Sequence, residues 1–162
     1  MNKIITTIEE IPVNKPFVQI WTDGSYKQHN GRGGYAALLY CNGETMLVFG
    51  DQYQTTINRM ELTAIIRALS FLQVPCTIEI RADSAYAMNG TNTWVEAWTE
   101  NGYINSKHKP VENRDLWEQI YTYKSKHDLI IRHVKSHTRR NDLHSQSNRL
   151  VDHFAVNGIS SQ

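Results

Sequence analysis

The sequence predicts a single α/β domain built around a mixed β-sheet. Short runs of β-branched and aromatic residues alternate with longer segments of helical periodicity, in the order β-β-β-α-β-α-α-β-α. An Asn42-Gly43 pair between two apolar runs is the strongest short hairpin signal and predicts antiparallel strands at the beginning. A strand–helix–strand passage follows and favours parallel pairing later in the sheet. A length of 162 residues fits one such domain.

Composition and charge narrow the class of protein. The chain has 40% hydrophobic residues and a net charge of +1, so any nucleic-acid site must be built from local patches. Residues 1–10 lack the apolar core of a signal peptide, and no apolar run has membrane-spanning length. Cys41 and Cys76 stand alone without metal-type spacing, which fits reduced thiols. We therefore expect a cytoplasmic protein with no membrane segment.

The first half of the chain supplies three strands and a helix. Residues 1–15 are interpreted as an N-terminal arm, 16–158 as the domain and 159–162 as a C-terminal tail. Strands are predicted over 17–22, 35–41 and 45–50, the last two flanking Asn42-Gly43. Apolar residues at helical spacing then predict a helix that Asn58 caps and that ends before Pro75: Leu62, Ile65, Ile66, Leu69 and Leu72.

The second half returns to the sheet twice. A strand over 76–82 is expected to pair in parallel with the first strand, because a helix separates the two. The remaining predictions are helices over 84–90, 91–100 and 112–126, a strand over 128–134, a polar loop over 135–146 and a helix over 148–156.

One phrase occurs twice, each time where a predicted strand ends. Thr22-Asp23-Gly24-Ser25 follows the first strand, and Ala82-Asp83-Ser84 follows the strand over 76–82. If these strands are parallel neighbours, both carboxylates emerge at the same sheet edge. The alternative is that each Asp makes a local turn with the residues after it.

Four carboxylates are candidates for chemistry: Asp23, Glu61, Asp83 and Asp152. No zinc or phosphate-loop signature is present, and clustered carboxylates without His or Cys ligands prefer hard cations such as Mg²⁺. Two such ions about 4 Å apart can clamp the attacking and leaving oxygens of a phosphoryl displacement. Glu61 has an alternative role in its helix's first turn, as the capping partner of Asn58 or by balancing the helix dipole.

These residues fall into motifs that resemble a known family, type 1 ribonuclease H. The matching segments, in family order, are Thr22–Ser25, Asn58–Leu62, Ala82–Tyr86, and Val134–His137 followed by Asn148–Asp152. The segment 90–98, with Trp94 and Trp98, is similar to the family's substrate-binding helix, and Lys109–Trp117 to the segment after it. The resemblance runs from about Phe17 to Val156, and it is the order of the motifs that makes it specific.

The resemblance implies a fold, a reaction and a metal site. The fold would be a five-stranded mixed sheet, with strands 1–3 antiparallel and strands 4 and 5 parallel, flanked by helices. The reaction would be endonucleolytic cleavage of the RNA strand of an RNA–DNA hybrid, leaving 5′-phosphate and 3′-hydroxyl ends. Asp23 would bridge two Mg²⁺ ions, with Mn²⁺ as a possible substitute, and Glu61, Asp83 and Asp152 would complete the site.

A histidine is expected to assist proton transfer or product release. The motif assigns this role to His137, and the alternative for that residue is a solvated loop position beside Arg139 and Arg140. The stretch from His137 to Asp152 is longer than usual in the family, so His144, in the same predicted loop, is a second candidate.

The resemblance also implies residues that bind the hybrid. Tyr86, Trp94 and Trp98 would line the groove for the DNA strand, although aromatics four apart on a helix are also typical of core contacts. Thr56 and Asn113 match positions that hold a DNA phosphate, and Asn58 belongs to the same substrate-binding set. We expect a monomer whose partner is the hybrid.

The departures from the family pattern concern substrate affinity. Ile57, Ala85 and Thr99-Glu100 replace polar or basic residues, and the remaining basic loop is Lys107, His108 and Lys109. Three other functions stay open on the sequence. They are a non-catalytic hybrid or single-strand binder, another nuclease or integrase of the same superfamily, and an α/β interaction domain whose acids have no catalytic role.

Overall fold

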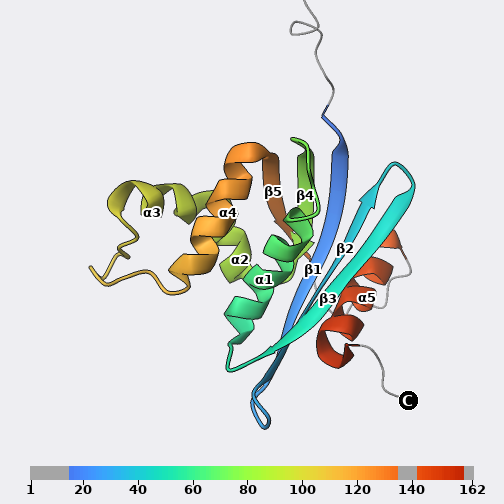
Figure 1. Cartoon of the computed structure of the whole chain (residues 1–162), viewed down its shortest axis with the longest axis horizontal. Coiled ribbons are helices and arrows are strands. Elements are labelled where there is room, and N and C mark those ends of the chain that lie inside the picture. Colours follow the sequence, from blue (N-terminus) through green and yellow to red (C-terminus); the bar gives the residue numbers. More distant parts are fainter. Residues whose placement is uncertain (1–14, 135–141, 159–162) are drawn as a thin grey trace, which may run out of the picture.

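A five-stranded mixed sheet forms the centre of the molecule (Figure 1). The computed structural model describes residues 15–134 and 142–158. The strands are β1 (Phe17–Lys27), β2 (Arg32–Cys41), β3 (Glu44–Tyr53), β4 (Thr77–Ala82) and β5 (Asp128–His133). The helices are α1 (Ile57–Leu69), α2 (Ala85–Asn89), a π-helical turn (Gly90–Trp94), α3 (Val95–Asn101), α4 (Arg114–Lys126) and α5 (Leu143–Asn157). Within the described ranges, none of these helices has the length and apolar character needed to cross a membrane.

The order of the strands confirms the predicted sheet. It is β3-β2-β1-β4-β5, with β1 to β3 antiparallel and β1, β4 and β5 parallel. β1 is therefore central, with β2 as its antiparallel neighbour and β4 as its parallel neighbour. Figure 1 shows α1, α2 and α4 on one side of the sheet and α5, in red, on the other.

β1 is longer than the sequence predicts, and the reason is its pairing with β2. The antiparallel ladder continues from Asp23 opposite Ala36 to Lys27 opposite Arg32, so Asp23-Gly24-Ser25 is strand and not a turn. Gly24 instead allows a close approach of two elements, because a Cβ at this position would lie 2.6 Å from the backbone nitrogen of Glu61 in α1. The turn prediction for Asp23 is therefore wrong.

α1 begins two residues earlier than expected, with its N-cap at Thr56 and not at Asn58. Thr56 has an extended backbone (φ −136°, ψ 164°), and its hydroxyl oxygen accepts a hydrogen bond from the N–H of Arg59 at 3.2 Å. Thr56 is thus the N-cap, and Asn58 lies inside the first turn. The prediction that Asn58 caps the helix is wrong, and so is the alternative in which Glu61 reaches back to an Asn58 cap.

α5 begins at Leu143, not at residue 148. Asp142 caps it by accepting a hydrogen bond from the N–H of Ser145 at 2.8 Å. The buried face of α5 is Ser147, Val151 and Ala155, at a spacing of four. Because Ser147 is polar, its turn carries no apolar signal, and the sequence therefore reads as loop over 143–147. Residues 135–141 of that predicted loop lie outside the described residues.

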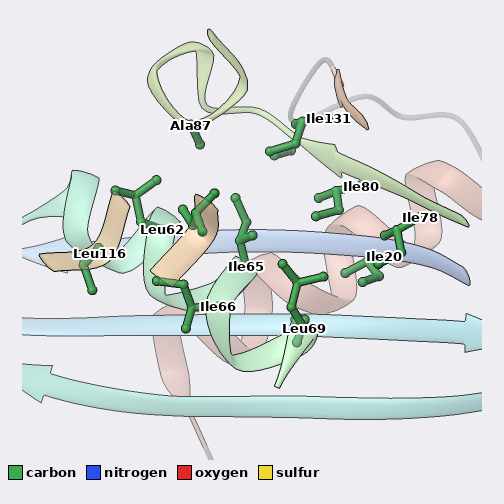
Figure 2. Packing of buried hydrophobic residues seen from close by; sticks show 14 of the residues in the cluster. Ile20, Leu62, Ile65, Ile66, Leu69, Ile78, Ile80, Ala87, Leu116 and Ile131 are labelled. Atoms are coloured by element: carbon green, nitrogen blue, oxygen red, sulfur yellow. The ribbon is translucent and has the colours of Figure 1, made fainter. Parts of the chain in front are cut away.

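Two apolar layers fix the helices to the sheet. On one face, Leu62, Ile65 and Leu69 of α1 belong to the same buried cluster as Ile20 and Ile80 of the sheet, and Figure 2 labels these side chains. On the other face, Trp21 and Ala36 pack against Val151 and Ala155 of α5. Successive residues of β1 point to opposite faces, so Ile20 and Trp21 serve the two layers in turn.

The second layer depends on a glycine in β2. An added Cβ at Gly34 would overlap the carbonyl oxygen of Ala155, which is backbone and cannot swing away. α5 therefore approaches β2 to the distance that only a glycine permits. Gly50 on β3 is different, because its added Cβ would meet only the hydroxyl end of the Tyr35 side chain.

We predict that Gly34→Ala destabilises the protein by roughly 1–3 kcal/mol, the usual cost of overpacking, because α5 must shift as a whole. Denaturant unfolding monitored by circular dichroism measures the change. Gly50→Ala is the matched control and is expected to cost clearly less, since Tyr35 can rotate. Equal losses for the two variants would contradict the close contact between β2 and α5.

Candidate active site

Asp23 lies on the central strand where parallel neighbours bring a second acid close. The β1–β4 register pairs Phe17 with Thr77 and Trp21 with Arg81, and its continuation brings Asp83 alongside Asp23. Asp23 is buried, and its Oδ1 accepts a hydrogen bond from the N–H of Gly24 at 2.9 Å. The expectation that both carboxylates emerge at one edge of the sheet is thus met by the register.

Glu61 reaches the same place from α1. The close contact of Gly24 with the backbone of α1 sets the position of Glu61. Glu61 is buried, with 5% of its surface exposed. One of its carboxylate oxygens, Oε2, is buried and has no hydrogen-bond partner among the described residues. A buried carboxylate oxygen without a partner is costly unless a ligand satisfies it.

The carboxylates form one cluster. Asp23, Glu61 and Asp83 each offer an oxygen, and these atoms all lie within 4.8 Å of one another. Asp152 of α5 lies close enough to Asp23 to raise the pKa of that carboxyl group. The structure therefore brings together all four acids that the sequence singled out, from β1, α1, α5 and the end of β4.

Burial and mutual repulsion disfavour the charged forms of Asp23 and Glu61. Burial first, and then the charges of Asp83 and Asp152, raise the pKa of Asp23 to about 8, against the opposing hydrogen bond from Gly24. Burial, followed by the charges of Asp23 and Asp83, raises the pKa of Glu61 to about 9. A bound cation would therefore favour the charged forms of both acids.

The donor set fits divalent metal ions of the Mg²⁺ type. Every ligand atom in the cluster is a carboxylate oxygen, which hard cations prefer. The unpartnered Oε2 of Glu61 is one position where a cation would replace a missing hydrogen bond. Because positive charge and a ligand for this oxygen are needed at the same point, the residues present suit a metal.

The two candidate histidines differ in what can be described. His137 lies outside the described residues. His144 is half-buried in the first turn of α5, with its ring centroid 5.7 Å from that of Trp21. Its Nδ1 is buried and has no partner among the described residues. The prediction that His144 lies in a loop is therefore wrong, because α5 begins before it.

The aromatic residues of the predicted groove form a continuous row. Ring centroids are 5.8 Å apart between Trp94 and Trp98, 5.3 Å between Trp98 and Trp117, and 5.4 Å between Trp117 and Tyr86. Trp94 is 41% exposed, whereas Trp117 is fully buried. The row leads to Tyr86, three residues after Asp83. The sequence did not single out Trp117 as part of this group, although its place in the Leu116-Trp117 segment was a signal.

The polar residues of the predicted set meet where α1 and α4 begin. Asn113 has a left-handed backbone (φ 60°), and its Oδ1 accepts a hydrogen bond from Nη1 of Arg59 at 3.3 Å. The guanidinium of Arg59 also donates to both carboxylate oxygens of Asp115, at 3.0 and 2.7 Å. Thr56 is exposed at the start of α1, and Asn58 is half-buried one turn before Glu61. Arg59, which sequence reasoning passed over inside its motif, links the two helices.

Comparison with known proteins agrees with this site. The family model for RNase H matches residues 15–160. The chain is 40% identical to a ribonuclease H of Zymomonas mobilis over 139 residues, which is 86% of this chain and 88% of that protein. It is also 40% identical to a ribonuclease HI of Rickettsia conorii over 141 residues, 87% of this chain and 90% of that protein.

Solved structures with the same fold include the RNase H domain of PFV, with a TM-score of 0.69, 26% identity and coverage of 90% of this chain and 95% of that one. LC9-RNase H1 superposes with a TM-score of 0.73 at 24% identity, over 89% of this chain and 72% of that one. With a family model that spans nearly the whole chain, curated relatives at 40% identity and the clustered acids of a metal site, the chain belongs to the ribonuclease H family.

Proposed function

We propose that this protein cuts the RNA strand of RNA–DNA hybrids, with Asp23, Glu61, Asp83 and Asp152 holding two Mg²⁺ ions. The observation that carries the proposal is the buried carboxylate cluster, in which Asp23, Glu61 and Asp83 bring oxygen atoms within 4.8 Å of one another. When bound, such ions activate a water and stabilise the departing oxygen, and Mn²⁺ would serve in their place. Membership of a metal-dependent nuclease family supports the same reaction.

The protein's own contribution is to hold the acids rigidly in place. Asp23 is fixed by the antiparallel ladder with β2 and by the N–H of Gly24. Glu61 is fixed by the contact of α1 with that glycine, and Asp152 by the packing of α5 on Trp21. Such preorganisation places the charges before the substrate arrives, so little reorganisation is needed during reaction.

The second group of residues would hold the hybrid. The exposed Trp94 and the half-buried Trp98 and Tyr86 offer ring faces for the sugars of one strand, and Thr56, Asn58 and Asn113 offer polar groups beside them. The structure of LC11-RNase H1 in complex with an RNA/DNA hybrid has the same fold, with a TM-score of 0.59 at 22% identity. Selection for RNA at the cleaved strand would depend on its 2′-hydroxyl groups.

We further propose a monomeric enzyme of the cytoplasm with one domain over residues 16–158. The main alternative is a hybrid-binding protein without catalysis. It is disfavoured because such a protein has no need of four converging acids, and this chain retains all of them. The ends of the chain, residues 1–15 and 159–162, would then flank the domain.

Asp23→Asn is expected to abolish cleavage, by roughly 1,000-fold or more, because the amide keeps the shape but loses the charge that binds the ions, an effect worth several kcal/mol. The measurement is cleavage of a labelled hybrid in Mg²⁺, with duplex DNA and duplex RNA as controls for specificity. Asp128→Asn, an exposed acid at the start of β5 paired with Lys15, is the matched control and is expected to keep full activity. Near-normal turnover by a folded Asp23→Asn variant would rule out the metal assignment.

His137→Ala is expected to lower kcat by about ten- to a hundredfold, since a side chain that transfers protons contributes roughly 10²–10⁴ and water replaces it in part. His144→Ala is the matched comparison, and we expect a smaller loss of kcat because this ring packs against Trp21. Rate measurements at saturating hybrid decide between the two histidines. A larger loss for His144→Ala would assign the role to the start of α5.

A further inference from the structure

The hydroxyl group of Tyr86 receives two hydrogen bonds from within the protein. The side-chain amide nitrogen of Asn113 donates to it at 3.0 Å, and the indole Nε1 of Trp117 donates at 3.1 Å. Tyr86 comes from α2 and the two donors come from the beginning of α4, so the hydroxyl lies where these helices meet.

The direction of both bonds is fixed by chemistry. An indole N–H can only donate. The amide of Asn113 is oriented by Arg59, which donates to its oxygen at 3.3 Å and so leaves the NH₂ group facing Tyr86. Arg59 is in turn held by two bonds to Asp115. Gly90 leaves the space that the ring of Trp117 occupies, because an added Cβ there would overlap that ring.

The hydroxyl group of Tyr86 can therefore donate its hydrogen to an acceptor other than these two residues. Both lone pairs of the oxygen are engaged, and no acceptor for the hydrogen occurs among the described residues. Two donors on one oxygen polarise its O–H bond, which strengthens it as a donor. Tyr86 is half-buried, so the hydrogen is available to solvent or to a ligand.

We propose that Tyr86 donates this hydrogen to a non-bridging phosphate oxygen of a bound nucleic-acid strand. A polarised donor near a guanidinium suits an anionic acceptor better than a 2′-hydroxyl, which also has a hydrogen to place. The aromatic row from Trp94 to Tyr86 marks the path that the nucleic-acid strand would follow. Asp83, an acid of the metal cluster, precedes Tyr86 by three residues in the sequence. This role rests on the proposed function. It makes Tyr86 a hydrogen-bond donor to a phosphate as well as a packing surface.

The test is Tyr86→Phe, which removes one oxygen and keeps the ring. Affinity for a labelled hybrid is measured by fluorescence anisotropy in EDTA, where no cleavage occurs, and cleavage is measured in parallel in Mg²⁺. The variant is expected to bind about tenfold more weakly, the effect of losing a hydrogen bond to a charged group. Tyr40→Phe, in β2 on the face that α5 covers, is the matched control and is expected to bind normally.

Single methylphosphonate replacements separate a direct contact from a structural role, since each removes the charge of one phosphate. One position is expected to weaken binding by the wild type about tenfold but to leave Tyr86→Phe unaffected. A DNA-strand series and an RNA-strand series show which strand carries that phosphate. If Tyr86→Phe binds normally, or if every replacement weakens both proteins equally, the proposal is overturned.

The outcomes also separate this proposal from the proposed function. A wild type that binds hybrid with the expected dependence on Tyr86, but does not cut it, refutes the nuclease function and supports the phosphate contact. A wild type that cuts hybrid while Tyr86→Phe is unchanged refutes only the contact. A wild type that neither binds nor cuts hybrid refutes both.

Discussion

The mutual repulsion of four carboxyl groups gathered in one buried site is the constraint around which this protein is built. Burial first, and then the charges of neighbouring acids, raise the pKa of Asp23 to about 8 and that of Glu61 to about 9. Such a cluster lowers the stability of the metal-free protein. It persists only because the rest of the fold holds its members in place. The same repulsion gives the site its affinity for cations.

Each part of the fold contributes to holding the cluster. The parallel register of β1 and β4 brings Asp83 alongside Asp23, and Gly24 lets α1 approach until Glu61 reaches the same point. On the opposite face, Gly34 lets the backbone of α5 rest on β2, and the layer around Trp21 keeps Asp152 in reach. The two apolar layers thus position acids from four elements that are far apart in the sequence.

The sequence predicts this arrangement where its signals are local or repeated. The Asn42-Gly43 turn predicts the antiparallel strands, and the helical spacing of Leu62 to Leu69 predicts the first helix. The strand–helix–strand passage predicts the parallel pair, and the repeated Asp phrase predicts that Asp23 and Asp83 share one edge of the sheet. The start of α5 was missed because Ser147 occupies a buried position with a polar side chain. A polar residue at a buried position interrupts the apolar pattern of the helix, and only the packed structure shows that Ser147 faces the core.

Other features could not be predicted because they depend on contacts between distant residues. Asn58 and Thr56 are both good helix caps, and only the structure shows that Thr56 has the extended backbone of the cap. The Asp23-Gly24-Ser25 run has turn residues, but pairing with β2 keeps it extended. The link from Arg59 through Asn113 to Tyr86 joins three helices and leaves no mark in any one of them.

The central claim is tested most directly by thermal unfolding of the wild type and Glu61→Gln at pH 5 and pH 9, with and without Mg²⁺. Folding raises the pKa of Glu61 from 4.5 to about 9. The contribution of this carboxyl group to stability is therefore fully present below pH 4.5 and is lost as the pH rises toward about 9. Without metal, Glu61→Gln should therefore match the wild type at pH 5 and exceed its Tm at pH 9. Saturating Mg²⁺ should raise the Tm of the wild type more than that of the variant. A metal-free variant less stable than the wild type at pH 9, with equal stabilisation of both by Mg²⁺, would contradict a repulsive carboxylate cluster that binds metal.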